Sequence, residues 1–449
     1  MRNYLSGKSS SFICRVMVIT LLAVGVTACS SEPEGETHVI EDEMKIMLDA
    51  WYPRVIDEEH GGYISSFSHD WEMTGTQEKM IVTQARHLWA LSKVMTRYPD
   101  NPDYPEFASQ GFEFLKDHMW DAEYGGFYQM VTREGEPIRD TYFGENYAKT
   151  LYGNSFAIYG LAAHYGATGN QESLDLAEQA FDWLEEHSHD KQYGGYFQPL
   201  QRDGTATREG YSKDYNSGIH ILEALTELYS VWPDELVGER LNEMFHIVRD
   251  TMVSEKGYLK LYFSEDWTHL SYQDSTKAEI MENIGRDHVT PGHDIETSFL
   301  LLEAAHALGM ENDPETERIA KLLTDHTLAT GWDDEVGGFY DTGYYFPGDD
   351  ELTITQDTKN WWAQAEGLNT LLIMADMYPD DPNNYLEKFE QQWEYINQYL
   401  IDHEHGGWYD SGLDKQPDSI DSRKSQIWKG NYHTLRAMMR VLERLEAQE

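Results

Sequence analysis

Histidines and carboxylates recur near the predicted starts of helices in this 449-residue chain. The stretch 291–305, PGHDIETSFLLLEAA, places His293 and Glu296 at i and i+3, so the two side chains share one helix face. Pro291 suits a first helical turn, where its missing N–H is not needed, and Thr290 can cap that turn. A histidine beside a carboxylate at a helix start can act as an oriented acid or base. The alternative is a capping acidic cluster with an incidental histidine.

Five further helices carry comparable side chains near their starts. These are Arg86 in TQARHLWALS, Tyr152 in YGNSFAIYGL, Asn216 and His220 in YNSGIHILEAL, Trp361, Trp362 and Glu366 in NWWAQAEGL, and Trp428 and His433 in WKGNYHTLRAM. If the six helices run in the same direction, their starts meet at one end of the molecule and add positive potential there. We therefore expect one pocket with three histidines, an arginine, two glutamates and several tryptophans.

Several kinds of chemistry are compatible with this set of residues. Two histidines facing one pocket suit proton transfer on opposite sides of a substrate carbon, because imidazole can start as acid or base near neutral pH. A proton beside a sugar carbonyl is a far weaker acid than imidazolium, so the resulting anion needs a permanent positive charge such as Arg86. Glu296 and Glu366 are instead candidates for the carboxylate pair of a glycoside hydrolase. A zinc site is the weaker alternative, because the chain has no HExxH motif, and we expect no metal and no cofactor.

A glycine-pair motif divides the chain into repeats. Its copies are EHGGY at 59–63, EYGGF at 123–127, QYGGY at 192–196, EVGGF at 335–339 and EHGGW at 404–408, with a degraded EKGYL at 255–259. Two helical patterns fall in each interval, and the predicted helices span 38–52, 77–97, 104–119, 146–167, 171–188, 215–231, 235–253, 292–309, 314–329, 357–377, 384–401 and 424–446. Six helical hairpins closing on themselves predict an all-α (α/α)6 barrel, with the less charged second helices as the inner ring. An open solenoid is the alternative, but it needs polar caps at both ends.

The first 28 residues have the features of a bacterial lipoprotein signal. Basic residues precede an apolar run at 16–26 that is too short to span a bilayer, and Cys29 follows it. We expect Cys29 to be lipidated, residues 29–37 to form a polar tether, and residues 38–449 to form one barrel domain. The formal net charge of −46 argues against nucleic acid as a partner. The expected protein is an exported monomer that meets a bacterial membrane only through its lipid anchor.

The stretches around Arg86, YNSGIHILEALTELYSVWPDE, GHDIETSFLLLEA, WWAQAEGL and WKGNYH together resemble the N-acylglucosamine 2-epimerase superfamily, and within it the cellobiose 2-epimerases. The resemblance covers about 40–446 and implies an (α/α)6 barrel with cofactor-free isomerase activity. The implied substrate is the reducing-end glucose or mannose of a β-1,4-linked disaccharide, cellobiose or mannobiose. Other readings are an aldose–ketose isomerase, a glycoside hydrolase or lyase, and a surface lipoprotein that only binds glycans.

The resemblance also implies roles for individual residues. His293 and His433 match the acid/base pair, Arg86 matches the arginine that binds the reacting oxygens, and Glu296 and Glu366 match glutamates that support the histidines. Asn216, His220, Trp362 and Trp428 match sugar-contacting residues, and Tyr152 and Trp361 belong to the same expected pocket. The chain departs from the family at Gly218, where a histidine is common, and its segments 130–147 and 273–290 look longer than usual. These departures affect the expected substrate more than the expected chemistry.

Overall fold

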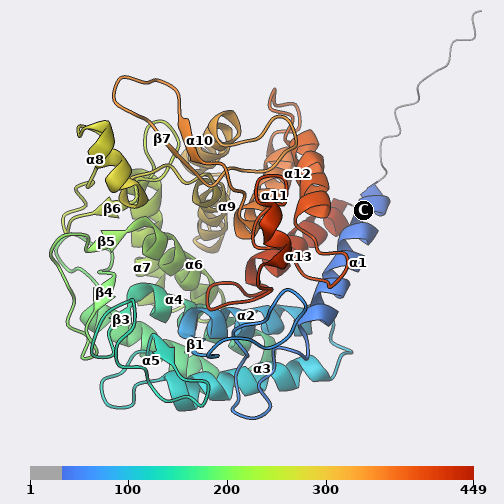
Figure 1. Ribbon diagram of the computed structural model, residues 1–449. Coiled ribbons are helices and arrows are strands. Elements are labelled where there is room, and N and C mark those ends of the chain that lie inside the picture. The colour runs from blue at the N-terminus through green and yellow to red at the C-terminus, as the bar shows by residue number, and fades with distance from the viewer. Residues whose placement is uncertain (1–32, 449) are drawn as a thin grey trace, which may run out of the picture.

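The computed structural model describes residues 33–448, whose helices form two concentric rings (Figure 1). The inner ring contains α2 (Ile81–Arg97), α4 (Leu151–Thr168), α6 (Tyr215–Val231), α9 (Pro291–Ala307), α11 (Trp361–Met377) and α13 (Tyr432–Gln448). The outer ring contains α1 (Pro33–Trp51), α3 (Asp103–Phe114), α5 (Gln171–His187), α7 (Glu235–His246), α10 (Pro314–Thr330) and α12 (Tyr385–Tyr399). Each inner helix packs against the next, and α13 packs against α2. The ring is therefore closed, which confirms the predicted (α/α)6 barrel and excludes an open solenoid.

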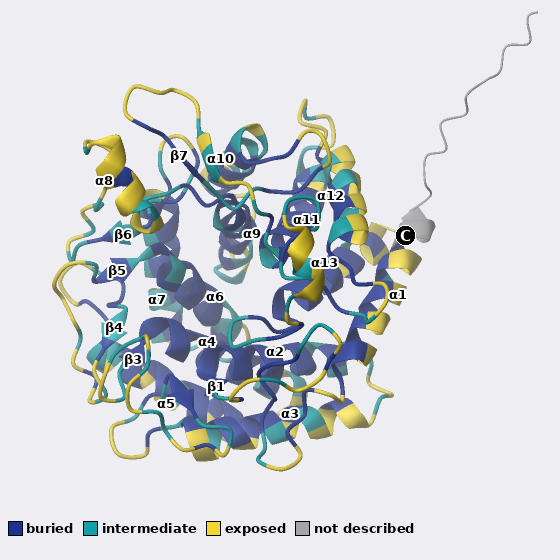
Figure 2. Cartoon of the chain, in the orientation of Figure 1, coloured by how far each residue is buried: buried dark blue, intermediate teal, exposed yellow. Residues whose placement is uncertain are grey.

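The two rings differ in how their side chains are buried. Every residue of α4 from Leu151 to His164 is buried, because this helix has neighbours on all sides. The outer helix α5 buries only the stripe that faces α4 and exposes its charged residues (Figure 2). An apolar stripe with a 3.6-residue period is what a helix with one face on a core requires. The predicted assignment of inner and outer helices is therefore confirmed.

Several inner helices begin later than the sequence predicted. Helix α4 begins at Leu151 instead of residue 146, α11 at Trp361 instead of 357, and α13 at Tyr432 instead of 424. Short extended pieces precede α2, α4 and α6 and pair with the following repeat, whereas two further strands pair with each other before α11. The antiparallel pairs are β1 (Lys79–Met80) with β2 (Met130–Val131), β3 (Lys149–Thr150) with β4 (Pro199–Leu200), β5 (Lys213–Asp214) with β6 (Tyr262–Phe263), and β7 (Thr342–Tyr344) with β8 (Thr353–Gln356). Two-residue strands carry no readable alternation, so the sequence pattern assigned β1 and β3 to the helices that follow them.

A buried ion pair fixes five of the six glycine-pair loops. In each, the lysine that precedes or lies near the start of an inner helix reaches back to the aspartate that opens the loop, giving the pairs Asp57–Lys79, Asp121–Lys149, Asp190–Lys213, Asp333–Lys359 and Asp402–Lys424. Lys213 is typical, since its Nζ donates to Asp190 Oδ2 at 2.7 Å and to the carbonyl of Gly194 at 2.8 Å. The glycines adopt positive φ, 75° at Gly194 and 70° at Gly195, which other residues rarely tolerate.

The remaining loop, the degraded one at 254–259, lacks both residues of this ion pair. Ser254 stands where the other loops have aspartate, and Val289 bridges to Gly343 in the place where Lys213 pairs with Phe263. The segment between them holds α8 (Lys277–Glu282), whose Ile280 packs with Tyr344 and Phe346 in a small separate apolar cluster. The longer segment predicted near 273–290 is thus an ordered structure at the edge of the barrel (Figure 1).

The N-terminal predictions fall partly outside the described residues. Helix α1 begins at Pro33, so residues 33–37 of the predicted tether are helical. Proline is well tolerated at the first helical position, which explains why a polar, proline-containing stretch still starts a helix. The signal segment and Cys29 lie before residue 33 and are not described. Within residues 33–448, no helix is both long and apolar enough to cross a membrane.

Candidate active site

Two histidines of the inner ring are each held by a glutamate through Nδ1. His433 at the start of α13 has its Nδ1 2.5 Å from Glu366 Oε1 on α11. His220 on α6 has its Nδ1 2.8 Å from Glu223 Oε2, one turn further along the same helix. A carboxylate at Nδ1 fixes the ring orientation and leaves Nε2 as the nitrogen that can face a substrate.

The third histidine, His293, is held by hydroxyl groups. Its Nδ1 lies 3.1 Å from Thr290 Oγ1 and 3.3 Å from the Tyr215 hydroxyl. Trp362 lies beside both candidate acid/base residues, with ring centroids 4.5 Å from His293 and 5.9 Å from His433. The predicted pair of histidines is therefore brought together around one tryptophan, from helices α9 and α13 that are far apart in the sequence.

Both of these histidines favour the neutral form. Burial lowers the pKa of His293 well below its ordinary value, and the positive charge of Arg86 adds to this effect. Burial also lowers the pKa of His433, again with contributions from Arg86 and Arg436. A neutral imidazole has a free lone pair, so either residue can accept a proton at neutral pH.

Arg86 is a buried positive charge without a carboxylate partner. Its guanidinium donates to the Tyr152 hydroxyl at 3.1 Å and stacks over Phe156 and Tyr432, at 4.2 and 5.0 Å from the ring centroids. Its Nε has no hydrogen-bond partner, and no ion pair with it forms among residues 33–448. Burying an unpaired charge is costly unless something stabilises it. This arrangement suits a group that binds negative charge developing on a ligand.

Arg436 joins the supporting glutamates, and the sequence analysis did not identify it. Its guanidinium lies 2.6 Å from Glu366 and forms short ion pairs with Glu296 and Glu223. Burial opposes ionisation of Glu223, but Arg436 and the hydrogen bond from His220 outweigh it and lower its pKa to about 2. Burial raises the pKa of Glu366. The sequence could have pointed to Arg436 and Glu223. Each lies three residues after a candidate histidine, His433 and His220, and therefore on the same helix face.

Two sets of side chains have the composition of a metal site. The groups His220, His293, Glu296 and Glu296, Glu366, His433 each place one ligand atom per residue within 4.8 Å of the others. Arg436 already contacts both glutamates, so a divalent cation there would lie beside a guanidinium of like charge. The positive charges of Arg436 and Arg86 therefore make this a poor cation site.

The remaining predicted residues divide into two groups. Trp428 lies 6.1 Å from the Tyr152 ring, which in turn is 5.3 Å from His220, so both tryptophan and tyrosine border the histidines. Asn216 on the first turn of α6 has a buried Oδ1 without a partner in the described chain. Trp361 instead lies in the core, with Lys429 over its ring at 5.1 Å. Adjacent helical residues point about 100° apart, so only one tryptophan of the Trp361–Trp362 pair faces the histidines.

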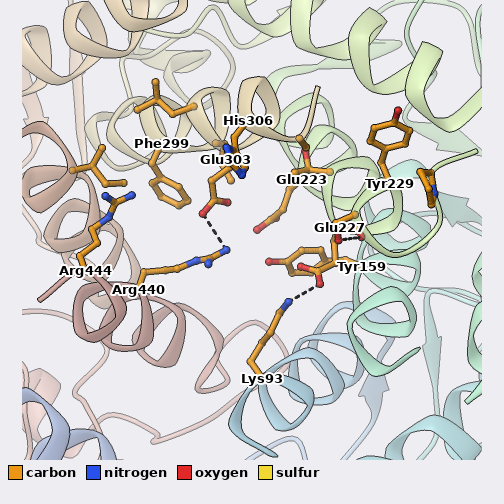
Figure 3. A pocket seen from close by; sticks show the side chains of 17 residues that line it. Lys93, Tyr159, Glu223, Glu227, Tyr229, Phe299, Glu303, His306, Arg440 and Arg444 are labelled. Atoms are coloured by element: carbon orange, nitrogen blue, oxygen red, sulfur yellow. Dashed lines mark hydrogen bonds and ion pairs between the residues drawn. The ribbon is translucent and has the colours of Figure 1, made fainter. Parts of the chain in front are cut away.

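A cavity of about 820 Å³ opens at the other end of the inner helices. Two ion pairs lie in its lining, with Lys93 2.5 Å from Glu227 and Arg440 3.1 Å from Glu303 (Figure 3). Its only histidine, His306, has a side chain that is 77% exposed. These ion-paired residues offer neither a neutral base nor an unpaired cation, unlike the histidines and Arg86 near the N-terminal ends of the inner helices.

Comparisons with known proteins agree with this arrangement. The family model for N-acylglucosamine 2-epimerase matches residues 62–437. A cellobiose 2-epimerase of Bacteroides fragilis is 29% identical over 413 residues, covering 88% of this chain and 95% of that protein. The structure of a cellobiose 2-epimerase from Spirochaeta thermophila superposes with a TM-score of 0.79 at 26% identity, covering 94% of this chain and 99% of the other.

A relative named for a different activity aligns over a similar length. A D-mannose isomerase of Marinomonas mediterranea is 24% identical over 415 residues, covering 90% of this chain and 97% of that protein. The family model extends over most of the barrel, including five of the inner helices in full and the histidines on α6, α9 and α13. The predicted family resemblance is thereby confirmed: the chain belongs to the N-acylglucosamine 2-epimerase family and is a carbohydrate epimerase.

Proposed function

We propose that this enzyme interconverts glucose and mannose at the reducing end of a β-1,4-linked disaccharide, by proton transfer at carbon 2. The observation that carries the proposal is the buried Arg86, which forms no ion pair within the described residues, in the same site as two buried histidines. The similarity to cellobiose 2-epimerases along nearly the whole chain supports the disaccharide substrate.

The proposed reaction has two proton transfers. His433 removes the carbon 2 proton through Nε2, while Glu366 holds its Nδ1. The electron pair left on carbon 2 moves toward the carbonyl, and the enediolate oxygens bind Arg86. His293, which must first take up a proton from solvent, donates that proton to the opposite face of carbon 2, which inverts the configuration, and His433 then releases its proton to solvent. In the reverse direction the two histidines exchange roles.

A glycoside hydrolase is less compatible with the same residues. Such an enzyme needs one carboxylate as acid and a second as nucleophile or base, both directed at the glycosidic bond. Glu296 and Glu366 are instead both ion-paired with Arg436. One oxygen of each contacts the guanidinium, and that oxygen of Glu366 also contacts His433, which fits a supporting role.

An aldose–ketose isomerase is the second candidate function. An enediolate that is protonated at carbon 1 instead of carbon 2 gives a ketose, so the same residues suffice. The D-mannose isomerase of Marinomonas mediterranea, with its alignment over 90% of this chain, supports keeping this candidate.

The test incubates the protein with cellobiose and with mannobiose in D2O and follows the sugars by NMR. We expect the carbon 2 epimer to form, with deuterium at carbon 2 where the base exchanges with solvent. Ketose formation would favour the isomerase, and cleavage of the disaccharide would favour a hydrolase. Activity that disappears with EDTA and returns with zinc would contradict the proposed chemistry.

Substitution of each histidine tests the assignment of roles. His293→Ala and His433→Ala should each lower the epimerisation rate by about 10²- to 10⁴-fold, the usual contribution of a general acid or base. His220→Ala should raise KM more than it lowers kcat. His306→Ala, in the cavity at the other end of the barrel, is the matched control and should leave the rate unchanged. A near wild-type rate in either of the first two variants would refute the two-histidine mechanism.

A further inference from the structure

A two-residue hairpin tip with two aromatic side chains lies beside the candidate active site. Thr141 and Gly144 pair with each other, with N–H···O distances of 2.9 and 3.1 Å, so that Tyr142 and Phe143 form the tip. Neither tip residue has a positive φ, so the turn accepts most side chains and its backbone does not by itself select two bulky aromatic residues.

The tip is directed at Trp428. The ring centroid of Phe143 is 5.7 Å from that of Trp428, and that of Tyr142 is 6.2 Å from it. Trp428 in turn lies 6.1 Å from Tyr152, whose hydroxyl accepts a hydrogen bond from Arg86. A continuous row of aromatic rings thus leads from the group that would bind the reacting oxygens to the surface.

The outer end of this row is open to solvent. Tyr142 is 62% exposed although its neighbour Phe143 lies only 4.0 Å away, measured between ring centroids. The loop that carries both residues is held in place, because the Tyr147 N–H donates to the Arg139 carbonyl at 2.6 Å and the Asn146 N–H to Asp140 at 3.0 Å. A fixed loop with an exposed aromatic ring is a suitable platform for the flat apolar face of a sugar ring.

We propose that Tyr142 and Phe143, together with Trp428, bind the second sugar unit of the substrate, the one that does not react. The inference rests on the proposed epimerase function and adds the residues that select a disaccharide over a monosaccharide. A monosaccharide held at Arg86 and the histidines does not extend to the hairpin tip. Removing the aromatic rings of the tip should therefore affect only longer substrates.

The test compares Tyr142→Ala, Phe143→Ala and the double variant on cellobiose and on free glucose and mannose. Stacking against an aromatic ring is worth about 3- to 10-fold in affinity. We expect KM for cellobiose to rise by that factor in each single variant and by more in the double variant. The kcat/KM for the monosaccharides should stay within about twofold of wild type. Tyr193→Ala, an exposed tyrosine on another loop, is the matched control.

The outcomes separate this inference from the proposed function. Equal losses on cellobiose and monosaccharides, or no loss on either, would overturn the role of the hairpin while leaving the epimerase intact. If the wild-type protein binds cellobiose by calorimetry but does not convert it, the proposed function fails. Weakened binding in the Tyr142 and Phe143 variants would then still support the sugar site.

Discussion

The degraded loop at 254–259 differs from the other five glycine-pair loops at two positions, that of the buried aspartate and that of its lysine partner. Five loops bury an aspartate–lysine pair, whereas the degraded loop has Ser254 and Val289 in the two corresponding places. Lys213 and Asp190 both have fully buried side chains. A single remaining charge of such a pair would be buried without a partner, which is far less favourable than losing both. The pair is therefore either complete or absent in every repeat.

A second difference accompanies the first. In three repeats an amide at the fourth position of the inner helix accepts the N–H of the aromatic residue after the glycine pair, as Gln84, Asn154 and Gln364 do. In the repeat with the degraded loop, Asp294 accepts the Leu259 N–H at 2.8 Å. The other carboxylate oxygen of Asp294 is buried without a partner in the described chain. Burial raises the pKa of Asp294, so it favours the protonated form, which resembles an amide. Asp294 is also the residue next to His293, so this exception lies directly beside the candidate active site.

The largest effect is expected from breaking one complete pair. Lys213→Met leaves Asp190 buried without its cation, and removing one member of a buried pair typically costs about 3–5 kcal/mol. Thermal or urea unfolding followed by circular dichroism measures this loss. Lys191→Met, on the same loop with an exposed side chain, is the control. A loss no greater than the control's would show that the ion pair does not hold the loop.

A smaller loss of stability is expected when both Asp190 and Lys213 are replaced, because the degraded loop at 254–259 also lacks both residues. Adding Asp190→Ser to Lys213→Met removes the unpaired carboxylate, so the double variant should recover about 2 kcal/mol of the single variant's loss. The same unfolding assay on both single variants and the double variant completes the cycle. Additive losses would mean that the two residues act independently and that the comparison with Ser254 and Val289 has no energetic basis.

The smallest effect, and a stabilising one, is expected from Asp294→Asn. Because the pKa of Asp294 is raised, the folded protein keeps a proton that the unfolded chain releases above about pH 3.9. Wild-type stability therefore decreases as the pH rises above that value, and the variant does not share this decrease. We expect the variant to be more stable by about 1 kcal/mol or more at pH 7, since each pH unit over which only the folded state keeps the proton costs wild type about 1.4 kcal/mol, and equal to wild type near pH 3.

The pH dependence of this difference is the informative measurement. Asn154 supports the expected geometry, because its Nδ2 donates to the Thr150 carbonyl at 2.9 Å, four residues earlier. A variant at position 294 can use the Thr290 carbonyl in the same way. A constant difference between pH 3 and pH 7, or a loss of stability at pH 7, would contradict a protonated Asp294.

The sequence alone determined the helices and the positions of the candidate acid/base residues along them. The helical patterns between the glycine pairs predicted twelve helices, most within a few residues of their observed ends. The glycine pairs predicted the repeats, and the starts of the inner helices predicted where His293 and His433 would meet. These properties depend on neighbours within one or two helical turns, which the sequence contains directly.

Tertiary structure decided the contacts between residues that are far apart in the chain. The Asp190–Lys213 pair joins two different structural elements, and Arg436 collects glutamates from three other inner helices. Trp361 and Trp362 are equally suitable candidates in the sequence, but the rotation of α11 within the ring directs only Trp362 to the histidines. Which side chains contact one another across the barrel depends on how the helices pack. Such contacts leave no local pattern in the sequence.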